Sequence, residues 1–262
     1  MRVVVPAILA LLAVAAIRAQ SPDLTEHFRD LNGTFVLLNG SSGKNVRHNR
    51  KRAAERFAPC STFKIPNTAI LLESGTVSDP GFILEYDPAL RQPQHWARDF
   101  DLRGAFKASA LWYYQVMARR AGMQTVQDFL EHFRYGNGDV SGGLDRTGNP
   151  FWVDGSLRIS ADEQVDFLRR FYEGQLGLSD RTTRLTREIM VVEDTPSWRL
   201  SAKTGACQPD GEDTSNWYVG YVEKDKAVYY FALQMGARDY GRAYSQRVPI
   251  ARAILTELGI LK

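Results

Sequence analysis

Apolar and polar positions alternate near both ends of the chain, which is the pattern of half-buried β-strands. Residues 33–49 read as a strand, a Gly/Ser turn and a second strand, and so predict a hairpin. Toward the other end, residues 198–206, 216–223 and 227–235 predict three further strands, the last two joined by a turn at residues 224–226. Strands are therefore expected at both termini.

Between these strands, apolar residues recur every three to four positions, as they do in helices. Pro66 must lie in an early turn or at a kink of the first helix. Strands at both ends with helices between them predict an α+β fold. We expect one antiparallel sheet built from both chain termini, flanked by helices, with a helical subdomain inserted within about 75–195. The predicted helices are residues 60–74, 104–121, 124–134, 160–174, 180–192 and 244–258.

The first 19 residues have the layout of a secretory signal peptide. Arg2 gives a positive start, residues 3–17 are apolar, and the small residue Ala19 precedes a polar glutamine. A membrane anchor is the alternative, but the apolar stretch is short and contains Pro6. We expect cleavage after Ala19 and an exported mature chain, residues 20–262, without stable membrane insertion.

Composition excludes several classes of protein. The chain has 262 residues, of which 44% are hydrophobic and 24% charged, so it can bury a sizeable core and is neither disordered nor collagen-like. The formal charge of +3 falls to +1 when Arg2 and Arg18 of the leader are left out, which leaves 31 basic and 30 acidic residues. Basic residues are interleaved with acidic ones, so we expect no nucleic-acid partner.

We also expect no metal site. The two cysteines cannot form a four-cysteine zinc site, and no two histidines have the spacing of paired metal ligands. The four histidines are His27, His48, His95 and His132.

Ser61 and Lys64 are the first candidate catalytic pair. Positions i and i+3 are neighbours on a helix, so the hydroxyl and the amine can meet. A serine needs an adjacent base to act as a nucleophile, and a lysine can be that base if burial suppresses its charge. The S-x-x-K spacing alone should occur by chance about once in a chain of this length. Its apolar surroundings argue against the alternative of a solvated helix face.

Lys203, Thr204 and Gly205 form the second element, within a predicted strand. A cation, a hydroxyl and a residue without a side chain can hold a carboxylate beside a nucleophile, while the backbone donates to an oxyanion. A plain strand with a surface lysine is the alternative. Neither element decides the function by itself.

These two motifs, taken in order with the other short motifs of the chain, resemble the class D (oxacillinase-type) serine β-lactamases of the penicillin-binding serine acyltransferase superfamily. The resemblance covers the chain from about residue 30 to its end, and the handful of motifs occur in the family's order. The S-D-N motif of class A is absent. The matching stretches are PCSTFK (59–64), LRGAFKASALWYYQ (102–115), YGN (135–137), SGGLD, FW and GSLRIS (within 141–160), and KTG (203–205).

The resemblance implies that residues 20–262 are a class D catalytic domain that opens the β-lactam ring of penicillin-type antibiotics and gives resistance to them. Ser61 would be acylated, and Lys64, carboxylated on its amine by CO2 (N6-carboxylysine), would be the general base. No other cofactor is implied. Trp152 would hold the carbamate, and Ser109 would relay a proton to the leaving nitrogen.

The remaining roles follow from the same resemblance. Lys203 and Thr204 would face the substrate carboxylate, and the next residue, Gly205, would belong to the same binding site. Arg247, placed just before the last helix, would form the salt bridge with that carboxylate. The backbone N–H groups of Ser61 and Ala206 would form the oxyanion hole. The structural residues would be Tyr135, Gly136 and Asn137.

Position 111 departs from the family pattern. The class D family has an S-x-V motif, which corresponds to Ser109-Ala110-Leu111 in this chain. Leucine in place of the valine adds a methylene beside the carbamate site. By the logic of overpacked cores this costs about 1–3 kcal/mol if it is not accommodated. The change could equally alter how water or CO2 reaches Lys64, so it bears on carbamate stability.

Cys60 precedes the nucleophile and Cys207 follows the KTG triplet. Certain class A carbapenem-hydrolysing enzymes join the same motif-relative positions by a disulfide, and the resemblance implies export to the bacterial periplasm, which is oxidising. A Cys60–Cys207 disulfide is therefore one hypothesis, and two free buried thiols are the other.

Two other functions share these motifs. One is a β-lactam sensor that is acylated without turnover, and the other is a peptidoglycan transpeptidase or carboxypeptidase. The sequence leaves open the preferred β-lactams, carbapenems included, the inhibitor profile, and whether the protein is a monomer or a homodimer.

Overall fold

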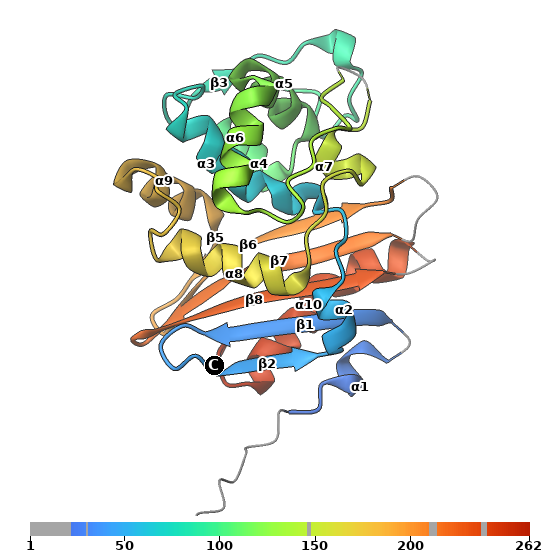
Figure 1. Cartoon of the computed structure of the whole chain (residues 1–262), viewed down its shortest axis with the longest axis vertical. Coiled ribbons are helices and arrows are strands. Elements are labelled where there is room, and N and C mark those ends of the chain that lie inside the picture. The colour runs from blue at the N-terminus through green and yellow to red at the C-terminus, as the bar shows by residue number, and fades with distance from the viewer. Residues whose placement is uncertain (1–21, 30, 146–147, 210–213, 237–239) are drawn as a thin grey trace, which may run out of the picture.

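The computed structural model describes residues 22–29, 31–145, 148–209, 214–236 and 240–262. The predicted leader, residues 1–19, lies outside these ranges. The described chain has two parts (Figure 1): a twisted antiparallel sheet with helices on both faces, and a cluster of helices above one end of that sheet.

The main sheet has six strands in the order β2-β1-β8-β7-β6-β5, and all its neighbours are antiparallel. Strands from the two ends of the chain meet where β1 pairs with β8. This confirms the predicted α+β fold with a sheet built from both termini. The strands are β1 (Asn32–Asn39), β2 (Asn45–His48), β5 (Val191–Asp194), β6 (Trp198–Cys207), β7 (Ser215–Lys224) and β8 (Ala227–Gly236).

Two faces of the sheet pack against different helices. Leu200 and Ala202 of β6 belong to a core with α10 (Tyr240–Glu257) and α1 (Thr25–Phe28). Because side chains alternate along a strand, Ser201 and Lys203 point to the opposite face, which carries α8 (Ala161–Tyr172) and the helical cluster. The candidate site therefore lies between the sheet and that cluster.

The helical cluster is held together by a large aromatic and aliphatic core. Trp112, Tyr113 and Tyr114 are all buried in it, as expected for a helix face turned to the core. A small second sheet, β3 (Ile83–Leu84) with β4 (Phe100–Asp101), lies at its edge. The other elements are α2 (Arg50–Ala54), η1 (Cys60–Phe63), α3 (Lys64–Glu73), η2 (Pro88–Leu90), α4 (Leu102–Ala108), α5 (Leu111–Ala121), α6 (Met123–Phe133), α7 (Phe151–Asp154) and α9 (Asp180–Met190).

Some predicted helices differ from the structure. The helix predicted for residues 60–74 begins as the 3-10 turn η1 and continues as α3 from Lys64. The single helix predicted for 104–121 is wrong, because the chain breaks at Ser109, whose φ of 57° is left-handed, and resumes as α5. The helix predicted to end at 192 ends at Met190. The β-branched pair Val191 and Val192 then begins β5, whose Val191 pairs with Ser201 of β6.

Candidate active site

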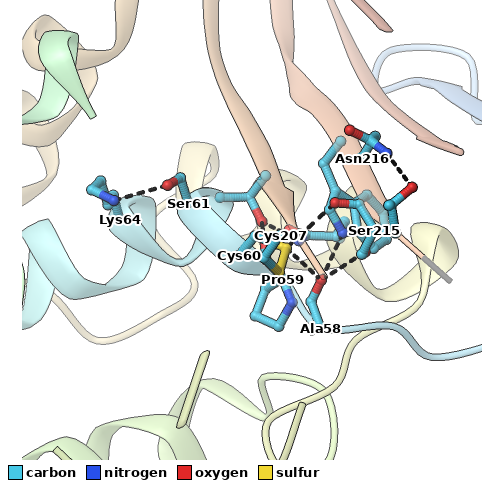
Figure 2. Close-up of a disulfide and its surroundings, with 12 residues drawn as sticks. Ala58, Pro59, Cys60, Ser61, Lys64, Cys207, Ser215 and Asn216 are labelled. Atoms are coloured by element: carbon cyan, nitrogen blue, oxygen red, sulfur yellow. Dashed lines mark hydrogen bonds between the residues drawn. A yellow bond between two sulfur atoms is a disulfide. The ribbon is translucent and has the colours of Figure 1, made fainter. Parts of the chain in front are cut away.

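Ser61 and Lys64 lie where a short 3-10 turn becomes a helix. Ser61 belongs to η1, and Lys64 is the first residue of α3. Lys64 Nζ donates to Ser61 Oγ over 2.9 Å, which is the i, i+3 contact predicted from the sequence (Figure 2). Pro66 lies in the first turn of α3, where its missing N–H removes no helical hydrogen bond.

The Lys64 amine is removed from water. Its side chain is 1% exposed, and burial, together with the nearby positive charge of Lys203, holds the pKa of Lys64 well below its ordinary value. A neutral amine has a free lone pair and can accept the Ser61 proton. The charge state required of a general base therefore follows from the packing of α3 into the core.

The KTG residues lie on β6, next to the Ser61 turn. Lys203 Nζ donates to Ser109 Oγ over 3.0 Å and to the carbonyl of Thr204 over 2.9 Å. Burial, followed by the charge of Arg247, lowers the pKa of Lys203 to about 7. Lys203 is 5% exposed, whereas Thr204 is half-buried at the rim.

Gly205 lets β6 approach the nucleophile turn. A Cβ at this position would lie 2.8 Å from the carbonyl oxygen of Pro59 and 3.1 Å from the backbone nitrogen of Thr62. Cys207 is joined to Cys60 by a disulfide with a Cα–Cα distance of 5.6 Å (Figure 2). The disulfide alternative of the sequence analysis is thus confirmed over two free thiols.

One side of β6 remains open beside Ser61. β7 pairs with β6 along its whole length, from Trp198 to Cys207, but the last residue of β6 that pairs with β5 is Ser201. From Ala202 to Cys207, this edge has no strand partner among the described residues. A cavity of about 400 Å³ lies beside it. Its lining is Phe106, Lys107, Ile189, Met190, Val191, Val192, Ala202, Lys203, Thr204, Tyr218 and Val248.

Arg247 lies inside α10, which overlaps the helix predicted for residues 244–258, so the expectation that it lies just before the last helix is wrong. Its guanidinium packs on the Tyr244 ring, with 3.7 Å to the centroid, and Nη1 donates to the Tyr244 carbonyl. Nε has no hydrogen-bond partner in the described structure. The side chain is 8% exposed, and its charge acts on Lys203, so the two cations share one region of the site.

Trp152 is fully buried in α7, and its ring stacks on Phe63 with centroids 5.1 Å apart. Because Phe63 immediately precedes Lys64, the indole lies on the nucleophile turn. The indole Nε1 is buried and has no hydrogen-bond partner within the described residues. Leu111 is half-buried at the start of α5, two residues after Ser109, and packs against the same core.

Tyr135, Gly136 and Asn137 form the loop beneath this core. The Gly136 φ is 58°, and a Cβ there would lie 2.0 Å from the Arg158 carbonyl oxygen, so only glycine fits. Asn137 Nδ2 donates 2.8 Å to the Ser156 carbonyl, and Asn137 Oδ1 accepts 2.8 Å from the Arg158 N–H. These bonds tie the loop to the segment that follows Trp152.

Sequence reasoning missed Gln164 and Trp96. Gln164, buried on α8, donates to Thr62 Oγ1 over 3.0 Å and to the Tyr135 hydroxyl over 3.3 Å. Trp96 Nε1 donates 2.9 Å to the Ala108 carbonyl, directly before Ser109. Both act across long sequence separations, and no local motif marks either of them.

Across the parts of the chain that the structure describes, no group of three or more His, Cys, Asp or Glu side chains is arranged to hold a metal ion. Within the same parts, no helix has the length and apolarity needed to cross a membrane.

Comparison with known proteins identifies the family. The penicillin-binding protein transpeptidase domain matches residues 33–256. Beta-lactamase OXA-10 of Pseudomonas aeruginosa is 36% identical over 230 residues, which cover 87% of this chain and 83% of that protein. Regulatory protein BlaR1 of Bacillus licheniformis is 33% identical over 229 residues, 87% of this chain but 37% of that longer protein.

A solved structure gives the same result. The crystal structure of the class D β-lactamase YbXI from Nostoc superposes with a TM-score of 0.85 at 34% identity, covering 91% of this chain and 99% of that chain. The motifs, the fold and these similarities agree. The chain belongs to the penicillin-binding protein transpeptidase family and, within it, to the class D β-lactamases.

Proposed function

We propose that this protein hydrolyses the β-lactam ring of penicillin-type antibiotics through an acyl-enzyme on Ser61 and thereby gives resistance to them. One observation carries the proposal. The Lys64 amine is buried, has a pKa well below its ordinary value, and lies 2.9 Å from Ser61 Oγ. A nucleophile and its base are therefore already in contact.

Acylation needs a proton acceptor, an oxyanion site and a proton donor. Lys64 takes the Ser61 proton as Oγ bonds to the β-lactam carbonyl carbon, and the carbonyl electron pair moves onto oxygen. The N–H groups of Ser61 and Ala206 donate to that oxyanion. Gly205 and Cys207, on either side of Ala206, pack against the turn that carries Ser61, which supports this pairing.

The ring then opens by cleavage of its C–N bond. Ser109 donates a proton to the ring nitrogen and is reprotonated from Lys203, to which it is hydrogen-bonded at 3.0 Å. Hydrolysis of the ester follows when water attacks the acyl carbonyl and Ser61 recovers its proton. The products are the ring-opened acid and free Ser61.

The residues around Lys64 fit a CO2 adduct on Nζ. Its neutral amine can bond to the CO2 carbon, releasing one proton, and the buried Trp152 Nε1 is a donor without a protein partner. When present, the carbamate supplies an anionic base for both half-reactions. Leu111 stands where the family pattern has valine, and we propose that its extra methylene alters how readily Lys64 is carboxylated.

Substrate binding uses the cations and the open strand edge. We propose that Lys203, Thr204 and Arg247 face the substrate carboxylate, because two buried cations in one region need an anion. The unpaired edge of β6 from Ala202 to Cys207 can pair with an amide of the substrate. Gly205 keeps the strand close to Ser61.

We further propose that residues 1–19 are removed on export and that the catalytic domain, residues 20–262, acts in the bacterial periplasm. The Cys60–Cys207 disulfide supports an oxidising compartment. The small-molecule substrate is the one partner that the proposal requires. Tyr135, Gly136 and Asn137 have a structural role in holding the Trp152 segment.

A β-lactam sensor is the second candidate, favoured by the similarity to regulatory protein BlaR1. It shares the acylation step with a β-lactamase, as does a peptidoglycan transpeptidase or carboxypeptidase. These functions differ in the fate of the acyl-enzyme: only a β-lactamase hydrolyses it with the antibiotic as substrate.

The test mixes the purified mature protein with a penicillin and follows hydrolysis and intact mass, with and without added bicarbonate. We expect multiple turnover that rises with bicarbonate and is lost in Ser61→Ala and Lys64→Ala. A stoichiometric, long-lived adduct without turnover would refute hydrolysis and leave a sensor or a transpeptidase.

A further inference from the structure

Asn67 is a buried polar residue that the reaction described above does not use. Its side chain is 0% exposed, and neither Oδ1 nor Nδ2 has a hydrogen-bond partner in the described structure. Its neighbours Ile65, Ala69 and Ile70 on α3 are apolar and buried. A buried carboxamide without a partner is destabilising, so its polar atoms need a partner from outside the protein.

The helix places Asn67 beside Lys64. The two residues are three positions apart on α3, so their side chains lie on one face of the helix. Helical side chains lean toward the N-terminus, so the Asn67 carboxamide lies over the turn that carries Lys64. The missing partner therefore belongs to the surroundings of the lysine.

The other polar side chains near that turn already have partners. Thr68, four residues after Lys64, is hydrogen-bonded to the Tyr114 hydroxyl at 2.7 Å. Lys64 itself donates to Ser61. The remaining group without a partner is the Trp152 Nε1, whose ring stacks on the residue before Lys64. Two unpaired buried donors, Nδ2 of Asn67 and Nε1 of Trp152, thus flank the same lysine.

We propose that Asn67 is a positioning residue that holds the carboxylated head group of Lys64. The inference rests on the proposed function, in which Lys64 Nζ bonds to the carbon of CO2 and loses one proton. The adduct has two oxygens that accept hydrogen bonds and keeps one N–H. The Asn67 carboxamide matches this group, because Nδ2 donates to a carbamate oxygen and Oδ1 accepts the remaining N–H.

The proposal predicts that Asn67 sets how tightly CO2 is held. In Asn67→Leu, which keeps the volume but removes both polar atoms, the bicarbonate concentration needed for half-maximal carboxylation should rise at least about tenfold. Carboxylation is measured by the 13C NMR signal of the carbamate with 13C-bicarbonate, independently of turnover. Hydrolysis at saturating bicarbonate should recover toward the wild-type rate.

Thr68→Val is the matched control. It lies on the same helix and is equally buried, but the bond it loses is to Tyr114, so it should lower stability without moving the bicarbonate midpoint. Asn67→Asp keeps the shape and replaces the donating NH2 by oxygen. It should also weaken carboxylation, and it provides the test if Asn67→Leu fails to fold.

Each outcome separates this inference from the proposed function. A wild-type protein without a carbamate signal or turnover would overturn the proposed function and this inference with it. A wild-type signal that persists at the same bicarbonate midpoint in Asn67→Leu, or in Asn67→Asp, would overturn the role of Asn67 alone.

Discussion

Lys203 on β6 donates a hydrogen bond to Ser109, a residue 94 positions earlier in the chain, over 3.0 Å. Ser109 is held in a left-handed conformation, φ 57°, at the end of α4. Such backbone conformations are strained in residues other than glycine and persist where surrounding contacts impose them. The pair connects the cation of the KTG strand with the hydroxyl proposed to protonate the leaving nitrogen.

The first prediction concerns pH. Because burial and the charge of Arg247 lower the pKa of Lys203 to about 7, this lysine loses its charge as pH rises through neutrality. For β-lactams that carry a carboxylate, we expect KM to increase from about pH 6 to about pH 9. Burial also holds the pKa of Lys64 well below its ordinary value. Steady-state kinetics across the range measures the effect.

Lys203→Arg is the control for this prediction, because arginine keeps its charge across the range. Its KM should be nearly independent of pH, even if its absolute value is higher. In the wild type, the pH dependence of folding stability is opposite to that of substrate binding. The unfolded lysine, with its ordinary pKa of 10.5, binds more protons than the folded one above about pH 7, so stability rises with pH in that window. A wild-type KM that stays constant from about pH 6 to about pH 9 would contradict the proposed role of Lys203 in binding the substrate carboxylate.

The second prediction concerns the disulfide, which joins Cys60 to Cys207 across a sequence separation of 147 residues. Loop-closure entropy for a separation of this size gives at most about 5 kcal/mol. Cys207→Ser should lower the free energy of unfolding by about 2–5 kcal/mol, as measured by denaturant titration.

The same disulfide anchors a strained residue beside the nucleophile. Cys60 has φ 50°, in the left-handed region, directly before Ser61. We therefore expect Cys207→Ser to slow acylation as well, since Cys60 is then free to relax. Cys60→Ser with Cys207→Ser should be no less stable than Cys207→Ser, because both break one bond. A loss that doubles in the double variant would contradict this account.

Local sequence rules predicted the parts of the site that are local. The i, i+3 spacing of Ser61 and Lys64 is enough to predict their contact, because helix geometry brings such positions together. Alternating strands at both ends predicted the sheet, and the arrangement known from certain class A enzymes offered the Cys60–Cys207 disulfide as one of two hypotheses. Each of these depends on a pattern that is visible within a few residues or in a known motif.

Other features depend on contacts that no local pattern reveals. The chain around Ser109 has the composition of a continuous helix, and the helix breaks there because tertiary contacts, including the Trp96 bond to the Ala108 carbonyl, fix another path. β5 forms because Val191 pairs with Ser201 of the neighbouring strand β6. Gln164 reaches Thr62 from 102 residues away. These are consequences of packing rather than of propensity.

The third prediction concerns Gly205, which lies against the backbone of the nucleophile turn. A Cβ would approach the Pro59 carbonyl oxygen to 2.8 Å and Thr62 N to 3.1 Å, and neither backbone atom can rotate away. In Gly205→Ala the strand and the turn must separate, which displaces Ser61 from Ala206. We expect kcat/KM to fall about 100-fold. Pre-steady-state acylation kinetics locates the loss.

Gly81→Ala is the control, because the one neighbour of its added Cβ is the Asp79 carboxylate oxygen at 3.1 Å, the end of an exposed side chain. It should leave kcat/KM unchanged. If Gly205→Ala acylates at the wild-type rate, close contact between β6 and the turn is not needed for catalysis.

The last prediction separates structure from chemistry at Asn137. Its side chain donates to the Ser156 carbonyl and accepts from the Arg158 N–H, each at 2.8 Å, and so fixes the segment that follows Trp152. Asn137→Ala loses these two bonds and the bond that Asn137 Oδ1 accepts from the Asp139 N–H at 3.3 Å. It should cost about 1–3 kcal/mol of stability, measured by denaturant unfolding. Asn137→Asp keeps the acceptor but sets a carboxylate against the Ser156 carbonyl. Its stability should therefore lie between those of the wild type and Asn137→Ala. Since Asn137 is exposed and bonds only to backbone, kcat at saturating bicarbonate should change less than stability does. A loss of turnover in a stably folded Asn137→Ala would instead place this residue in the reaction.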